Sequence, residues 1–242
     1  MLITKIMKKR KIAYLAPEFL PTWGGVGIYS VELVKELSKY KDLEIHVITP
    51  KRGKNYNKKR ILSYFNNKIH IHNISTANDT FFYNIKFQLG LLTNFPKLHK
   101  KYGFDLVHSA NLVHMPDIFL KLFKKIKIPT ICTTHTTIDS QSRIKGEKKI
   151  RGIIKRGEKV ETLSKITYPY IKIMQNYYLK NTDKFIAVSN YTRKLIPSLK
   201  NISVVHNGVN LDKFKSKTNE NNYFDYLEKI RYPKIRYVGR LL

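Results

Sequence analysis

Short apolar runs alternate along the chain with longer segments whose apolar residues recur every three or four positions. Runs bounded by proline, glycine or polar residues are typical of buried strands, and the longer spacing is typical of helices. The expected strands are residues 12–16, 44–49, 69–74, 104–108, 129–134, 184–189, 202–206 and 234–238. Because strands and helices alternate throughout, the sequence predicts an α/β fold with a doubly wound, mostly parallel, Rossmann-like sheet.

The helical pattern is clearest after the first strand, where Val26, Tyr29 and Leu33 share one face. Further helical segments are expected at residues 78–102, 116–126, 143–160, 171–179 and 223–231. Two prolines should set boundaries, because proline lacks a backbone N–H and disrupts helices and central strands. We expect Pro50 to end the second strand and Pro169 to interrupt the helical pattern before residue 171.

A glycine-rich loop, with Gly24, Gly25 and Gly27, joins the first strand to the first helix. Glycine lets backbone N–H groups approach a ligand closely, and a helix N-terminus carries a partial positive charge. The loop therefore suits a phosphate, although an ordinary tight turn has the same sequence features. A P-loop is excluded because Ile28 and Tyr29 follow the last glycine. A dinucleotide fingerprint fits poorly because its third glycine would fall at Ser30 and its glycines would follow the strand at once.

Among the histidines, His135 has the most suggestive place, just beyond the fifth predicted strand. Open parallel sheets bind ligands at the carboxyl ends of their strands. An imidazole there can hydrogen bond to a substrate hydroxyl or a phosphate oxygen. The competing interpretation is a histidine tied to a backbone carbonyl at the end of a strand.

Metal binding and disulfide formation find little support in the sequence. His70 and His72 share one face of the third predicted strand, but no cysteine or carboxylate lies next to them in the chain, so no metal site is predicted. The single cysteine, Cys132, lies in an apolar run and is expected to be a buried small hydrophobic residue. A chain with one cysteine forms no internal disulfide, which fits a reducing compartment.

The charge points to an anionic partner: 46 basic and 17 acidic residues leave a net charge of +29. Nucleic acid, anionic lipid and a phosphorylated substrate all qualify, but no zinc finger, RNP sequence or helix-turn-helix signature supports nucleic acid. A basic amphipathic segment is the best candidate for an anion- or membrane-binding surface. Its basic residues are Arg143, Lys145, Lys148, Lys149, Arg151, Lys155, Arg156 and Lys159. A plain surface helix remains the alternative for this segment.

No apolar run approaches the roughly 20 residues that a membrane-spanning helix needs. The N-terminus is basic and lacks the apolar region of a signal peptide. These features predict a cytoplasmic protein that binds peripherally to the inner face of the membrane through its basic segment.

Four segments in order resemble the family 4 glycosyltransferases, which have the two-domain GT-B fold. They are residues 11–15 with 21–27, residues 104–108, residues 187–189 with 204–210, and residues 237–241. The likeness covers nearly the whole chain but only the N-terminal half of that family. It implies an N-terminal acceptor-side domain over residues 1–210, an interdomain linker over 211–232, and the start of a nucleotide-sugar domain over 233–242.

The resemblance implies transfer of a hexose, with retention, from a nucleotide-diphosphate sugar to a lipid-linked or glycan acceptor. It places Gly24, Gly25 and Gly27 at the donor diphosphate, Arg240 at the same diphosphate, and His135 beside the transferred sugar as the catalytic residue. It implies no metal and no cofactor beyond the donor itself.

Some positions depart from the family pattern. Ala110 and Asn210 stand where the family often has histidine and aspartate, and the lysine and paired glutamates of its C-terminal half have no counterpart here. We therefore expect a truncated form that is inactive without a C-terminal half, which a separate chain would have to supply. The alternative function is a non-catalytic module that binds an anionic glycan or lipid.

Overall fold

A computed structural model of the chain describes residues 9–21, 24–53, 56–77, 83–112, 115–136 and 157–208. The chain divides into two compact units, residues 1–207 and 208–242, and every element described below belongs to the first. The expected linker and the expected start of a second domain lie outside the described residues, so the proposed domain boundaries stay a prediction.

The first unit is built on a seven-stranded, all-parallel sheet in the order β3-β2-β1-β4-β5-β6-β7. Its strands are β1 Arg10–Leu15, β2 Leu43–Arg52, β3 Ile69–Ala77, β4 Leu106–Ser109, β5 Thr130–Thr134, β6 Lys184–Ala187 and β7 Ile202–Val204. The predicted fold class is thus confirmed. The strand order reverses between β1 and β4, and such a switch point is where doubly wound sheets bind ligands.

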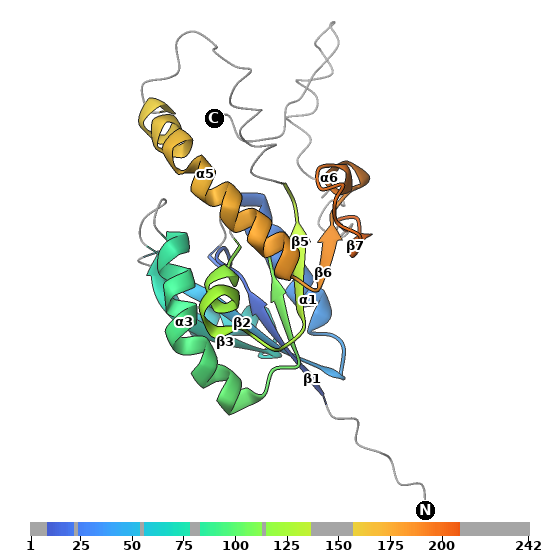
Figure 1. Cartoon of the computed structure of the whole chain (residues 1–242). Helices are drawn as coiled ribbons and strands as arrows, with labels where there is room; N and C mark the ends of the chain where they lie inside the picture. The colour runs from blue at the N-terminus through green and yellow to red at the C-terminus, as the bar shows by residue number, and fades with distance from the viewer. Residues whose placement is uncertain are drawn as a thin grey trace, which may run out of the picture. The chain divides into compact units, whose positions relative to one another are not determined.

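Helices cover both faces of this sheet (Figure 1). They are α1 Gly24–Leu37, α2 Lys58–Tyr64, α3 Tyr83–Tyr102, η1 Leu120–Lys124, α5 Gly157–Asn181 and α6 Asn190–Lys194. Side chains of α1 and α2 pack on one face, and those of α3, η1 and α5 pack on the other. None of the helices among the described residues is long and apolar enough to cross a bilayer.

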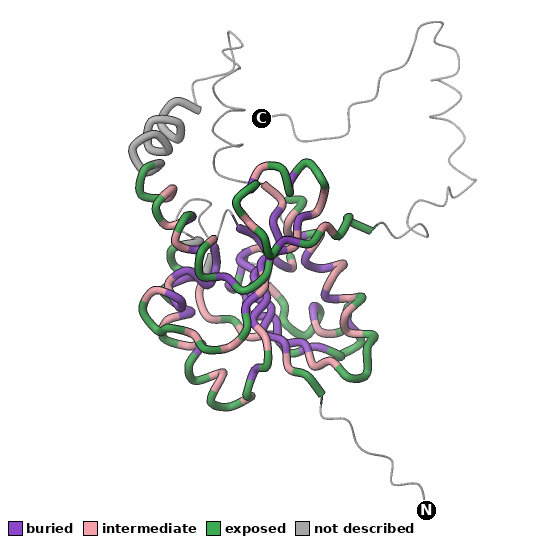
Figure 2. The backbone as a smooth tube through the Cα atoms, turned by 45° about the vertical axis from the view of Figure 1, so that its right-hand side comes forward, coloured by how far each residue is buried: buried purple, intermediate pink, exposed green. Residues whose placement is uncertain are grey.

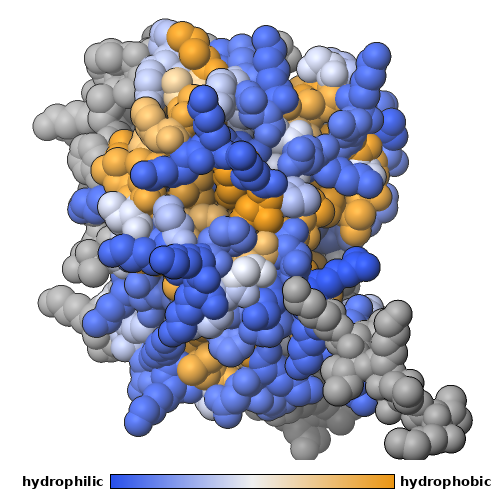
Figure 3. Space-filling view, turned by 60° about the horizontal axis from the view of Figure 1, so that its bottom comes forward, coloured by the Kyte–Doolittle hydropathy of each residue, from blue (hydrophilic) through white to orange (hydrophobic). Residues whose placement is uncertain are grey.

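The strands have apolar residues on both sides because both faces are covered. In β1, Tyr14 contributes to the core beneath α1, whereas Ala13 and Leu15 contribute to the core beneath α3. Tyr178 of α5 and Phe185 of β6 anchor a third cluster. Figure 2 shows buried residues concentrated along the strands and exposed ones on helices and loops. Toward the amino ends of the strands the surface is mainly hydrophilic, with separate hydrophobic patches (Figure 3).

Two sequence predictions about proline were wrong. Pro50 does not end the second strand, because β2 runs to Arg52 through a shift in its register with β3 at residues 49–51; such irregularities accommodate a residue without an N–H. Pro169 does not break the helix, because it lies inside α5. The lost backbone hydrogen bond costs about 3 kcal/mol, and burial of Tyr178 in the same helix favours continuation.

A buried polar chain connects α1 to the strands at the switch point. Ser30 of α1 donates a hydrogen bond to the Val26 carbonyl (2.8 Å) and accepts one from the Tyr14 hydroxyl (3.1 Å). The ring of Tyr14 meets the imidazole of His108 edge-on at 5.0 Å, and His108 Nε2 lies 2.8 Å from Thr133 Oγ1. These contacts join α1, β1, β4 and β5 through side chains that satisfy one another away from water.

Gly90 marks the close approach of α3 to the edge strand β3. A Cβ at this position would lie 2.6 Å from the carbonyl oxygen of Ile74. A backbone oxygen cannot move aside as a flexible side chain can, so the helix can lie this near to β3 only with glycine here.

We predict that Gly90→Ala destabilises the protein by about 1–3 kcal/mol, since the new methyl group forces α3 away from β3. For a domain of this size, the melting temperature should fall by about 2–4 °C per kcal/mol. The matched control is Leu89→Ala on the same helix, where the side chain is exposed. Equal melting temperatures for the two variants would show that the close approach carries no energetic constraint.

A second prediction concerns acid. Burial lowers the pKa of His108 to about 4, whereas an unfolded histidine titrates near 6.5. Between these values the unfolded state binds more protons, so stability is lost as the pH falls from about 6.5 to about 4. We expect His108→Gln to be less stable than wild type at pH 7.5. When the pH is lowered from 7.5 to 4.5, the free energy of unfolding of this variant should fall less than that of wild type. The difference between the two decreases should be on the order of 1–3 kcal/mol. Urea unfolding at both pH values measures this, and parallel losses would contradict it.

Candidate functional site at the sheet switch point

The glycine loop opens directly into α1, as the sequence predicts. Gly24 begins the helix with φ of 69°, a left-handed conformation in which any side chain is strained. A Cβ added at Gly25 would meet nothing within 4 Å, so this stretch of backbone is open to an approaching ligand. The first turn of α1 contains no acidic residue, so no side chain of that turn neutralises the positive end of the helix dipole.

The side chain of Glu18 lies across this loop, which the sequence reasoning did not anticipate. Its Oε2 is 3.6 Å from the position of a Cβ at Gly24, and its Cβ is 3.6 Å from that of a Cβ at Gly27. Gly27 itself is buried. A carboxylate at this place occupies the same positive end of the helix that a phosphate would occupy. A bound diphosphate would therefore have to share this end of the helix with Glu18 or displace it.

His135 lies immediately beyond β5, as expected, and its ring packs against α1. The imidazole meets the ring of Tyr29 edge-on, with centroids 4.6 Å apart and an interplanar angle of 79°. The structure therefore brings the end of β5 and the second turn of α1 together on one side of the sheet. Gly24, Gly25 and Gly27 begin the same helix, so the glycine loop and His135 border the same edge of the sheet.

The environment of His135 leaves one of its nitrogens without a partner. The Ala110 backbone hydrogen bonds to the imidazole, yet burial outweighs this and lowers the pKa of His135 to about 4. The ring is thus neutral at pH 7. Its Nε2 is buried, and no hydrogen-bonding partner for it occurs in the described part of the chain. An unpaired buried polar atom costs about 1–3 kcal/mol, and in native structures such atoms often mark a binding or catalytic role.

Tyr29 holds this arrangement together. Its hydroxyl shares a hydrogen bond with Thr133, and burial raises its pKa. Thr133 also contacts His108, so Tyr29 extends the buried polar chain to His135. The sequence identified Tyr29 only as an apolar position of a helix. Its second role depends on a hydroxyl that reaches β5, and no spacing in the sequence reveals that contact.

Behind the switch point, on the α5 face, lies a second buried polar group. Asp117 Oδ1 accepts a hydrogen bond from Ser109 (2.6 Å), and Lys121 donates to Thr130 (2.8 Å). Desolvation raises the pKa of Asp117 and lowers that of Lys121, and their mutual attraction opposes both shifts. Cys132 is fully buried beside them, and burial raises the pKa of its thiol. The prediction of a buried cysteine is confirmed, and this group has the character of a structural core.

Other candidate site residues fall outside the described part of the chain. Arg240 lies beyond residue 208. In the basic segment, α5 begins at Gly157, so Lys159 lies in its first turn, where only the backbone is described. The remaining basic residues outside the described ranges are Arg143, Lys145, Lys148, Lys149, Arg151, Lys155 and Arg156. Their roles stay predictions.

Several solved structures of longer proteins share this fold. Sucrose-phosphate synthase from Thermosynechococcus elongatus aligns with 90% of this chain and 53% of its own, at a TM-score of 0.64 and 14% identity. Anabaena HepE, determined in complex with UDP-glucose, aligns with 90% of this chain and 50% of its own, at a TM-score of 0.53 and 13% identity. Phytolacca americana UGT2, determined in complex with UDP-2fluoro-glucose and pterostilbene, aligns with 92% of this chain and 57% of its own. The TM-score is 0.52 and the sequence identity is 10%.

At such identities these similarities establish the fold alone, and the chain spans about half the length of those proteins. Among curated protein sequences no match is found. A comparison with protein-family models is more specific. The model for Glycosyltransferase Family 4 matches residues 23–213, from the glycine loop to beyond β7. With the all-parallel sheet and the placement of His135 beside α1, this match shows that the chain belongs to glycosyltransferase family 4.

Proposed function

We propose that the described unit is the acceptor-side domain of a retaining glycosyltransferase that uses a nucleotide-diphosphate sugar. The observation that carries the proposal is the contact between His135 and Tyr29 at the switch point, with Nε2 of His135 buried and unpaired. Structural relatives determined with UDP-glucose or a UDP-sugar analogue support a nucleotide-sugar as the donor.

The donor diphosphate is proposed to lie at the start of α1. Backbone N–H groups of Gly24, Gly25 and Gly27 and the helix dipole would face its oxygens. When the glycosidic bond breaks, negative charge grows on the departing diphosphate, so fixed donors there stabilise the transition state more than the ground state. Arg240 would add a charge-assisted hydrogen bond to the same group. With these groups in place, the proposed transfer uses no metal at the diphosphate.

His135 is proposed to touch the transferred sugar. Because burial keeps its imidazole neutral at pH 7, Nε2 is available either to donate to or to accept from a sugar hydroxyl, depending on the tautomer. A hydroxyl at this place would supply the hydrogen bond that Nε2 lacks. Tyr29 acts as a positioning residue, since its ring and its bond to Thr133 hold the imidazole at the edge of the sheet.

The acceptor is proposed to be anionic and either lipid-linked or a glycan, reached at the inner face of a membrane. The support is the net charge of +29 and the concentration of basic residues between 143 and 159. A nucleotide-sugar domain, in the same polypeptide or in a separate one, is the further part that sugar transfer requires.

To test sugar transfer, residues 1–242 are fused to a C-terminal nucleotide-sugar domain of the same family. We expect the joined protein to hydrolyse or transfer from a nucleotide-sugar, and His135→Ala to lower kcat/KM by about 10²-fold or more, since a transition-state hydrogen bond is lost. The matched control is His99→Asn. Nδ1 of His99 accepts a hydrogen bond from the Phe104 N–H, and the Asn oxygen can replace it.

Retained activity in His135→Ala, at wild-type melting temperature, would overturn the assignment of this residue. If the joined protein binds an anionic glycan or lipid but never turns over a nucleotide-sugar, the chain is a non-catalytic binding module instead.

Vesicle flotation tests the membrane proposal. The full chain should float with vesicles containing phosphatidylserine and not with phosphatidylcholine alone. Replacing Lys148, Lys149, Arg151 and Lys155 by alanine should weaken binding roughly 10²-fold or more, at about 1 kcal/mol for each basic residue near the surface. The control replaces four basic residues elsewhere, Lys58, Lys59, Arg60 and Lys68. Equal flotation with both lipids, or equal loss in both variants, would contradict the proposal.

A further inference from the structure

The candidate site described above lies at the carboxyl ends of the strands. Near the amino ends of β2 and β3, three histidines and a glutamate lie together on the face of the sheet that α3 covers. Glu44 and His46 come from β2, and His70 and His72 come from β3. Parallel pairing sets His46 directly beside His70. Along the chain no carboxylate adjoins the two histidines of β3, but the pairing of the two strands supplies one.

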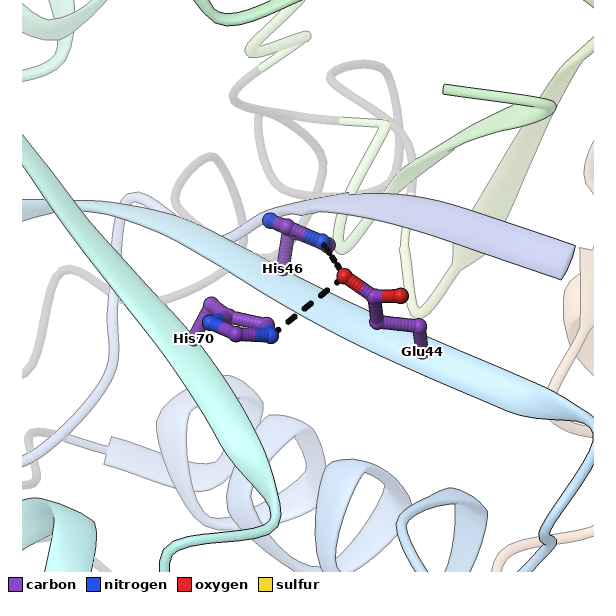
Figure 4. A group of neighbouring side chains, drawn as sticks. All are labelled: Glu44, His46 and His70. Atoms are coloured by element: carbon purple, nitrogen blue, oxygen red, sulfur yellow. Dashed lines mark hydrogen bonds and ion pairs between the residues drawn. The ribbon is translucent and has the colours of Figure 1, made fainter. Parts of the chain in front are cut away.

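Distances within this cluster are short. Glu44 Oε1 lies 2.8 Å from His46 Nε2 and 3.4 Å from His70 Nε2, and both imidazoles turn toward this carboxylate oxygen (Figure 4). Nδ1 of His46 lies 3.0 Å from Nε2 of His72. One potential ligand atom from each of Glu44, His46 and His70 can be chosen so that all three lie within 4.8 Å of one another.

We propose that Glu44, His46 and His70 bind a divalent transition-metal ion, with Zn²⁺ as the best fit. Two imidazoles and a carboxylate are a ligand set that zinc accepts, with a fourth position left to water. At bond lengths of roughly 2.0–2.1 Å, the edge of a coordination tetrahedron is about 3.3 Å. The separation between Glu44 and His70 already matches that edge, and the one between Glu44 and His46 must lengthen slightly.

The separation between Glu44 and His46 can lengthen through Glu44, whose side chain is 25% exposed, because that of His46 is 0% exposed and is held from several sides. The side chain of His70 is 51% exposed and can follow. The His46 ring stacks on His70 at 4.4 Å and meets Tyr102 at 4.6 Å and Phe104 at 5.1 Å. A fixed ligand in the core and an adjustable ligand at the surface suit a site that an ion enters from solvent.

His72 supplies the outer contact that metal-binding histidines commonly have. When the ion binds Nε2 of His46, the proton must lie on Nδ1, where it can be donated to Nε2 of His72 at 3.0 Å. The proton that lies on Nε2 of His46 without the ion must therefore move to Nδ1, and His72, which then accepts at Nε2, must carry its own proton on Nδ1. This change of tautomers releases no net proton. In this arrangement His72 fixes the tautomer of His46 and does not itself bind the ion.

The surroundings of the cluster act on its charge in both directions. Burial lowers the pKa of His46 and that of His72. Partial burial raises the pKa of Glu44, but the hydrogen bond from His46 and nearby positive charges outweigh this and lower it. Lys11, Lys58 and Lys101 also act on the cluster and oppose a cation. The ion would bridge β2 to the edge strand β3 and hold their register.

The experiment uses the untagged 242-residue chain after chelation, titrated with Zn²⁺ in a calorimeter at pH 7.5. We expect one ion per chain and a higher melting temperature in its presence. Co²⁺ in place of Zn²⁺ should give the visible absorption of a tetrahedral site with imidazole ligands. His70→Ala and Glu44→Gln should each weaken binding by at least about tenfold. His206→Ala is the control, because His206 is an exposed histidine outside the cluster.

His70 is half-exposed, so His70→Ala should keep the wild-type melting temperature without metal. Absence of saturable binding at one ion per chain would overturn the proposal. So would unchanged affinity in both His70→Ala and Glu44→Gln, because the ion would then lie elsewhere. The result does not depend on sugar transfer, since the cluster and the switch point lie at opposite edges of the sheet.

Discussion

The packing of α1 against β1 and the end of β5 is the interaction on which the candidate site depends. Tyr29 crosses from the helix to Thr133, and its ring supports His135. Ser30, one residue further along α1, ties the same helix to Tyr14 of β1. Since α1 also begins with the glycine loop, the position of the loop relative to His135 is set by these few contacts.

Burial determines what this arrangement can do. The imidazole of His135 is desolvated enough to stay neutral, and its Nε2 has no partner among the described residues. His108 is also buried and neutral, but its Nε2 has a hydrogen-bonding partner in Oγ1 of Thr133. Two histidines at the ends of neighbouring strands thus differ in one respect. His108 completes a structural chain of contacts, whereas His135 retains an unused hydrogen-bonding atom at an edge where ligands bind.

The two edges of the sheet carry different chemistry for a topological reason. At the carboxyl edge, loops lead into helices and present backbone N–H groups, which suit anions. Near the amino edge, the pairing of β2 with β3 brings Glu44, His46 and His70 together, and these side chains suit a cation. A parallel sheet keeps such sites apart because every strand runs in the same direction.

The sequence alone determined the alternation of strands and helices, the glycine loop before α1 and the place of His135 after β5, because local periodicity and turn residues encode them. The sequence wrongly predicted that Pro50 ends the second strand and that Pro169 interrupts a helix. The register of β2 with β3 and the packing of α5 override the local propensity of proline. The tertiary structure alone decided that Tyr29 meets His135, that Glu18 lies over the glycines and that Glu44 joins His70. Those contacts join residues distant in sequence or on different elements, and only the order and register of the strands bring them within reach.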